Sequence, residues 1–64
     1  MTRHEAAIIS AYTGIFIGYF TDFHRYVEYL MDRPVMTYEL DDPEVSIRIK
    51  ELAKPDFMNI DVAG

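Results

Sequence analysis

The chain has 64 residues, a formal net charge of −5 and no cysteine, which excludes disulfides and thiolate metal sites. Such a length permits one domain. The small core of such a domain gives marginal stability, which association with other chains can supplement. We therefore expect a single domain over residues 1–64, with a flexible tail over residues 58–64, and a homo-oligomer in which a dimer is favoured.

The six basic residues stand singly along the chain, whereas nucleic-acid binding needs clustered lysine and arginine side chains. We expect no direct contact with nucleic acid. The acidic balance fits solubility, and it also fits a partner with a basic surface. The sequence shows no apolar run behind a basic start, and nothing close to the ~20 apolar residues of a membrane span. A cytoplasmic protein with no membrane contact is the expectation.

The first expected element is a helix over residues 3–13. Thr2 and Glu5 match a capping box, in which the hydroxyl and the carboxylate each accept a hydrogen bond from the other residue's backbone N–H. Gly14 suits the position after the last turn, because the left-handed conformation costs glycine little.

Residues 15–18 combine β-branched and aromatic side chains and end in a glycine. Such a run fits a short strand. It also fits a continued helix, because periodicity cannot separate the two over so short a run.

The second expected helix covers residues 22–32, with Thr21 or Asp22 as its cap. Its apolar side chains recur at helical spacing and predict a core stripe: Phe23, Tyr26, Val27, Leu30 and Met31. Arg33 precedes Pro34, and a residue before proline is disfavoured in helical conformation. The helix is therefore expected to end near residue 32.

Residues 35–40 are the stronger strand candidate. Alternation would place Met36, Tyr38 and Leu40 on one apolar face. If residues 15–18 are also a strand, the two could pair with the second helix as a short crossover. Such a pair of short strands needs helices to cover it.

Residues 41–44, Asp-Asp-Pro-Glu, give the strongest local signal in the chain. A carboxylate cap, a proline at the first helical position and an acid in the first turn all favour a helix start. A third helix over residues 43–53 follows, and Pro55 is expected to end it. Three helices with one or two short strands predict an α+β fold.

The runs AAIISAYTG, FTDFHRYVEYLMDRPVMTYEL and ELAKPDF resemble a family of small proteins encoded by phages and prophages of Gram-positive bacteria. The most specific pieces are Ala11-Tyr12-Thr13-Gly14, His24-x-Tyr26-Val27-Glu28 and Arg33-Pro34-Val35. The resemblance covers residues 5–57. It implies a phage origin and carries over no catalytic residue.

His24 and Glu28 lie one helical turn apart, so their side chains can meet. A zinc site needs three or four ligands, and no further residue completes a known spacing. An exposed contact between the two is therefore the favoured interpretation. Ser10, Thr13 and Thr37 would be nucleophiles only beside a base. We expect no catalytic residue, no metal, no cofactor and no enzymatic activity.

Two groups of side chains are candidates for protein interaction: Tyr19, Phe20, Tyr29, Asp41, Asp42 and Glu44. The aromatic group lies outside the clearest core stripe and could stack on a base or anchor an interface. A dimer seam or core filling is the favoured alternative. The acidic group could mimic nucleic-acid phosphates, although helix capping explains at least two of the acids and is favoured.

We expect a non-enzymatic phage-type accessory protein that binds and inhibits a host or anti-phage defence protein. An alternative is an oligomeric binder of a small nucleotide, in which aromatic side chains and Arg33 at a subunit seam hold a base. A third possibility is a structural or regulatory phage protein that only self-associates.

Overall fold

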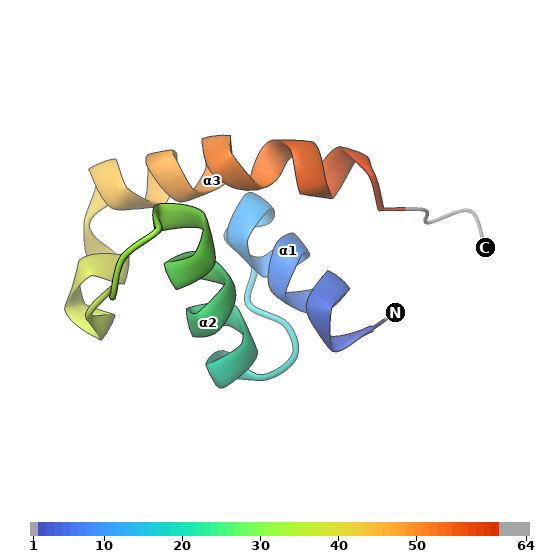
Figure 1. The fold of residues 1–64 in the computed structure, drawn as a ribbon, viewed down its shortest axis with the longest axis horizontal. Helices are drawn as coiled ribbons and strands as arrows, with labels where there is room; N and C mark the ends of the chain where they lie inside the picture. Colours follow the sequence, from blue (N-terminus) through green and yellow to red (C-terminus); the bar gives the residue numbers. More distant parts are fainter. Residues whose placement is uncertain (1, 61–64) are drawn as a thin grey trace.

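The computed structural model describes residues 2–60, and this part of the chain is helical. Its elements are α1 (Arg3–Thr13), α2 (Phe20–Met31), the 3-10 helix η1 (Thr37–Asp41) and α3 (Pro43–Met58). α3 lies across the ends of α1 and α2 (Figure 1). Residues 2–60 contain no strand, so the α+β prediction, with strands over residues 15–18 and 35–40, is wrong.

Helix α1 has the boundaries and the caps that the sequence predicts. The Thr2 N–H donates to Glu5 Oε1 at 2.8 Å, and the Glu5 N–H donates to Thr2 Oγ1 at 3.1 Å. Gly14 follows the last turn with φ 77°, and its N–H donates to the Ser10 carbonyl. Both termini of α1 are therefore set by local hydrogen bonds.

The linker over residues 14–19 returns along α1, because both α1 and α2 rise toward α3 (Figure 1). The buried Ser10 hydroxyl accepts from the Ile17 N–H at 2.9 Å and lies 3.0 Å from the Ile17 carbonyl oxygen. Gly18, at φ 79°, passes so close to α1 that an added Cβ would lie 3.0 Å from Ala6 Cβ. One serine side chain thus accepts from the Ile17 N–H, which a strand would pair, and its single proton lies within reach of the carbonyls of both Ala6 and Ile17.

Helix α2 starts earlier than predicted, with Tyr19 as a cap that makes no side-chain hydrogen bond. Neither Thr21 nor Asp22 is the cap, so that prediction is wrong. Asp22 lies in the first turn, where a carboxylate is favourable, and it accepts from Arg3 Nε at 2.7 Å. The helix ends as expected before Pro34, and Asp32 adopts the left-handed conformation at φ 56°.

Val35 is buried and is held by its backbone to one face of α2. His24 Nε2–H donates to the Val35 carbonyl at 2.5 Å, and the Val35 N–H donates to Glu28 Oε2 at 2.9 Å. Side chains of α2 therefore take both backbone groups that a strand would offer to a neighbour, which explains why no strand starts here.

The predicted apolar strand face over residues 35–40 is also wrong. Met36 and Tyr38 are 60% and 74% exposed. Glu39 accepts from the Met36 N–H at 2.8 Å and closes the first turn of η1. The carboxylate of Glu39 also pairs with Arg33 at 3.1 Å, so the segment folds into a local turn.

Helix α3 begins as predicted, because Asp42 accepts from the Glu44 N–H at 2.9 Å. Its predicted end at residue 53 is wrong, since the helix continues through Pro55 to Met58. A proline inside a helix removes one backbone hydrogen bond. Two tertiary contacts hold the last turn: Phe57 stacks on Tyr12 at 4.3 Å, and Asp56 accepts from the Tyr26 hydroxyl.

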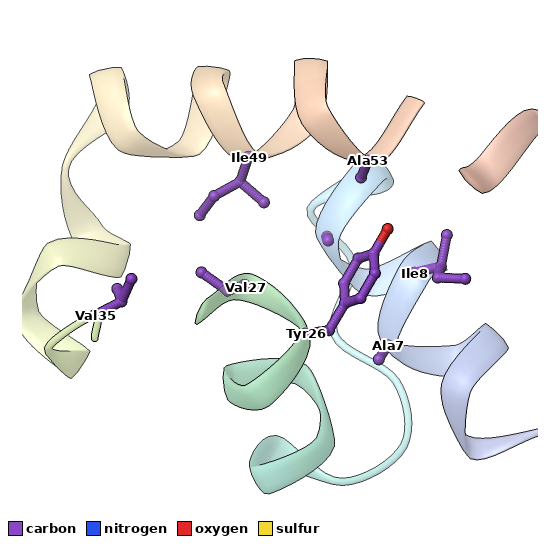
Figure 2. Close-up of a cluster of buried hydrophobic side chains, with 8 residues drawn as sticks. Ala7, Ile8, Tyr26, Val27, Val35, Ile49 and Ala53 are labelled. Carbon is purple, nitrogen blue, oxygen red and sulfur yellow. The ribbon is translucent and has the colours of Figure 1, made fainter. Parts of the chain in front are cut away.

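The core lies where α3 crosses the other two helices (Figure 2). Its buried members are Ala7, Ile8, Ala11, Tyr26, Val27, Val35, Ile49 and Ala53. Three of them are alanines, which let the helix backbones approach closely. The Phe57 and Ile60 side chains are partly buried against this core. The predicted flexible tail over residues 58–64 therefore holds a packed residue at 60, and its part over residues 61–64 lies outside the described residues.

Candidate protein-interaction site

Three phenylalanine rings meet at the start of α2. The ring centroids of Phe16 and Phe23 are 5.8 Å apart, and Phe20 lies 6.0 Å from each of them. Phe16 and Phe20 remain 51% and 44% exposed. His24 stacks on the Phe20 ring at 5.8 Å. The cluster is thus held in place by its own aromatic contacts while much of it faces solvent.

These rings form one wall of a hollow of about 210 Å³, which we call the aromatic cleft. Its lining residues are Ser10, Ala11, Gly14, Phe16, Phe20, Phe23, Leu40, Ser46 and Ile49. The cleft is therefore built by α1, the linker, α2, η1 and α3 together. Its lining is mostly apolar, and Ser10 and Ser46 are its polar residues with a side chain.

The predicted acidic residues lie at the junction of η1 and α3, next in sequence to residues of the cleft lining but not part of it. Asp41 follows Leu40 directly, and Glu44 lies two residues before Ser46. Asp41, Asp42 and Glu44 are all exposed. Asp42 has a structural role as the cap of α3, whereas no cap hydrogen bond involves Asp41.

Glu39 adds a further carboxylate on η1, and its charge is matched inside the protein. Hydrogen bonds from the Arg33 guanidinium, and then from the Met36 N–H, lower the pKa of the Glu39 carboxyl. Arg33 also donates to the Pro34 carbonyl. Arg33 therefore makes its contacts within its own chain. The nucleotide-binding alternative had placed this residue at a subunit seam.

The other two predicted aromatic residues lie away from the cleft lining. Tyr19 is exposed, and the guanidinium of Arg3 sits over its ring at 4.4 Å. Tyr29 is 75% exposed and stacks beside Tyr26, with ring centroids 6.3 Å apart. Of the three predicted aromatic residues, the structure brings only Phe20 into the cleft.

Sequence reasoning missed three lining residues that complete the apolar wall: Phe16, Phe23 and Leu40. Phe16 belonged to a run that also fitted a strand, while Phe23 and Leu40 were assigned to the core stripe and to a strand face. No local pattern predicts that they meet. The available signal was the density of aromatic residues over residues 16–23, where Phe occurs at 16, 20 and 23.

A second hollow, of about 310 Å³, lies between α1 and α2. Its lining residues are Arg3, His4, Ala7, Asp22, Arg25, Tyr26 and Tyr29. We call it the arginine pocket. It shares no lining residue with the aromatic cleft, and it contains the predicted interaction residue Tyr29.

His24 and Glu28 approach each other as predicted, with Nε2 and Oε2 3.7 Å apart. Both side chains are engaged with the backbone of Val35. Residues 2–60 hold no cluster of three or more histidine, aspartate or glutamate side chains placed to bind a metal ion. The hydroxyls of Ser10 and Thr13 make hydrogen bonds to backbone groups.

The chain matches the family described as "Domain of unknown function (DUF7736)" over residues 3–63. It belongs to this family. No curated protein and no solved structure shows a match to the chain. The match to the DUF7736 family covers nearly the whole sequence, so the residues of both the aromatic cleft and the arginine pocket lie within it. Among the described residues, no helix is both long and apolar enough to span a bilayer.

Proposed function

We propose that this DUF7736 protein is a non-enzymatic accessory protein of phage origin. In this proposal it binds and inhibits a host or anti-phage defence protein through the aromatic cleft. The observation that carries the proposal is the half-exposed phenylalanine cluster of Phe16, Phe20 and Phe23 at the mouth of an apolar hollow. The phage origin rests on the sequence resemblance described above.

The energetics of the cleft favour a protein partner. Complete burial of one phenylalanine side chain contributes about 1.5–3 kcal/mol relative to exposure. Aromatic side chains seated in pockets recur as the residues that dominate binding energy at interfaces. Phe20 is held between two neighbouring rings and His24, so little side-chain entropy remains to be lost when a partner covers it.

The acidic residues at the junction of η1 and α3 favour a partner with a basic surface. Asp41, Asp42 and Glu44 are exposed at the junction of η1 and α3, the elements that supply Leu40 and Ser46 to the lining. A complementary surface presents an apolar side chain to the cleft and lysine or arginine side chains to its edge. Such an interface associates faster at low ionic strength, because opposite charges steer the encounter.

The test has two stages. A tagged protein captures a partner from a bacterial lysate, and the partner is then purified and its binding to variants is measured by calorimetry. Phe20→Ala and Asp41→Lys are expected to weaken binding about ten-fold or more. Ile47→Ala is the matched control, since Ile47 is exposed on α3 outside the cleft lining. The activity of the purified partner is expected to fall when the wild-type protein is added.

An equal affinity of Phe20→Ala and Ile47→Ala for the partner would contradict the assignment of the cleft. Unchanged activity of the partner in the complex would contradict inhibition. Asp42→Asn serves as a further variant, because asparagine keeps the cap of α3 while it removes one charge.

Self-association is a second candidate function. Large apolar side chains are exposed outside the cleft lining and favour it, including Tyr38, Ile47 and Met58. Two copies would each contribute a net charge of −5, so salt should strengthen a dimer by screening their repulsion. Light scattering at low and high salt gives the mass. A dimer that persists in Phe20→Ala leaves the cleft free for a different protein.

A further inference from the structure

The arginine pocket joins the first turns of α1 to one face of α2. Arg3 and His4 come from α1, while Asp22, Arg25 and Tyr29 come from α2. The aromatic cleft lies elsewhere and is built from other residues. The two hollows can therefore be altered one at a time.

The pocket carries an excess of positive charge. Arg3 donates to both oxygens of Asp22, from Nε at 2.7 Å and from Nη2 at 3.1 Å. This bidentate pair balances the one carboxylate that lines the pocket. Within residues 2–60, Arg25 has no carboxylate oxygen within 4.0 Å of its guanidinium. A local cation in a chain of net charge −5 favours an anionic ligand.

Three of the residues that line the pocket are aromatic: His4, Tyr26 and Tyr29. Tyr26 is buried, with its hydroxyl committed to Asp56, so its ring forms a fixed support. His4 meets the Tyr26 ring edge-on, with an interplanar angle of 88°. The ring of Tyr29 lies at 25° to that of Tyr26 and is 75% exposed. Tyr29 therefore offers an aromatic surface on which a planar ligand can stack.

We propose that the arginine pocket binds a small aromatic anion of the nucleoside monophosphate class. The Arg25 guanidinium holds the phosphate, and the base stacks on the ring of Tyr29. A guanidinium matches a phosphate through two parallel hydrogen bonds. Arg3 contributes its Nη1 group, because its bonds to Asp22 use only Nε and Nη2.

The size of the pocket supports this ligand class. A volume of about 310 Å³ lies at the lower end of the range of about 300–1,000 Å³ that small-molecule sites occupy. A mononucleotide is a compact ligand of that scale. The site differs from the subunit seam with Arg33 that the sequence indicated, because Arg33 pairs with Glu39.

The experiment is a titration of the full chain with adenosine 5′-monophosphate, followed by nuclear magnetic resonance of the backbone amides and by calorimetry. Saturable binding is expected, with shifts centred on residues 3, 4, 25 and 29 and an affinity that falls as salt is added. Arg25→Ala is expected to weaken the affinity about ten-fold or more, since it removes a charge-assisted hydrogen bond. Lys54→Ala is the matched control, since Lys54 is an exposed cation on α3 outside the pocket.

Two ligand fragments separate the two halves of the proposed site. Adenosine lacks the phosphate and ribose 5-phosphate lacks the base, so each is expected to bind more weakly than the whole nucleotide. Tyr29→Ala should reduce the affinity for the nucleotide while leaving that for ribose 5-phosphate unchanged. Circular dichroism checks that each variant retains its helices.

The proposal is overturned if adenosine, guanosine, cytidine and uridine monophosphates all give no saturable shifts up to about 10 mM. That concentration is roughly ten times a dissociation constant of about 1 mM, which already corresponds to weak binding. Equal affinity of wild type and Arg25→Ala would also overturn it. None of these results bears on partner binding at the aromatic cleft, which is measured with Phe20→Ala.

Discussion

The hydroxyl of Tyr26, on α2, donates a 2.6 Å hydrogen bond to Oδ2 of Asp56, on α3. Asp56 directly follows Pro55, so this bond holds the turn of α3 that the proline would otherwise weaken. The ring of the same tyrosine is buried in the core (Figure 2). One side chain thus joins the core, the end of α3 and the floor of the arginine pocket.

The variant Tyr26→Phe keeps the ring and removes this hydrogen bond. It leaves a partly buried carboxylate without its donor, so we expect a loss of about 1–2 kcal/mol in the free energy of unfolding. Urea denaturation followed by circular dichroism measures it. Tyr29→Phe is the control, because Tyr29 is an exposed tyrosine on the same helix. Equal stability of the two variants would show that the Asp56 bond contributes nothing.

The environment of the Tyr26 hydroxyl should make the free energy of unfolding depend on pH in the alkaline range. Burial first, and then the hydrogen bond to Asp56, raise the pKa of the Tyr26 hydroxyl. The unfolded chain therefore loses this proton at lower pH than the folded chain. The stabilisation is fully present below a pH of about 10, the ordinary tyrosine value, and is lost as the pH rises toward the folded pKa.

Denaturation of wild type and Tyr26→Phe at a series of alkaline pH values measures this effect. The wild-type free energy of unfolding should fall more steeply than that of the variant above a pH of about 10. Parallel curves for the two proteins would exclude Tyr26 as the source of the dependence.

Gly18→Ala tests the close approach of the linker to α1. Gly18 has φ 79°, and an added Cβ would lie 3.0 Å from Ala6 Cβ. Gly14→Ala is the matched control, because Gly14 has φ 77° and open space around it. Both variants should lose about 1–2 kcal/mol through the left-handed conformation. Gly18→Ala should lose more, because the linker must also shift. Thermal unfolding of both variants measures the difference, and an equal loss would mean that the approach to Ala6 is not restrictive.

Pro55→Ala tests whether tertiary contacts keep the last turn of α3 helical despite the proline. Proline costs about 3 kcal/mol relative to alanine inside a helix. Because Asp56 and Phe57 already hold the last turn in the native structure, alanine should restore a backbone bond without moving them. We expect a higher melting temperature and greater helicity. A lower melting temperature would show that the proline is itself needed for the contacts with Tyr12 and Tyr26.

Local sequence signals predicted the elements whose ends are fixed by local hydrogen bonds. The capping box of Thr2 and Glu5 gave the start of α1, and Asp42 gave the start of α3. The predicted strands failed because their backbone groups bond to side chains distant in sequence. Ser10 binds residue 17, and Glu28 binds residue 35. No periodicity in a short segment reveals such partners.

The candidate sites were predictable only in part for the same reason. The sequence indicated Phe20 and the acids after Leu40, but the meeting of Phe16 with Phe23 depends on how the linker returns along α1. Arg25 and Tyr29 lie one turn apart on α2, and only the packing of α1 beside α2 adds Arg3 and His4 to them. Side chains brought together by helix packing are beyond the reach of a local pattern.

The most direct test of partner binding through the aromatic cleft is the affinity of a purified partner for wild type, Phe20→Ala and Ile47→Ala, measured by calorimetry in one buffer. If the cleft is the interface, Phe20→Ala weakens the complex about ten-fold or more, while Ile47→Ala binds as wild type does. If Phe20→Ala binds as tightly as wild type, the cleft is not the interface, and the proposed binding of a partner through it is wrong.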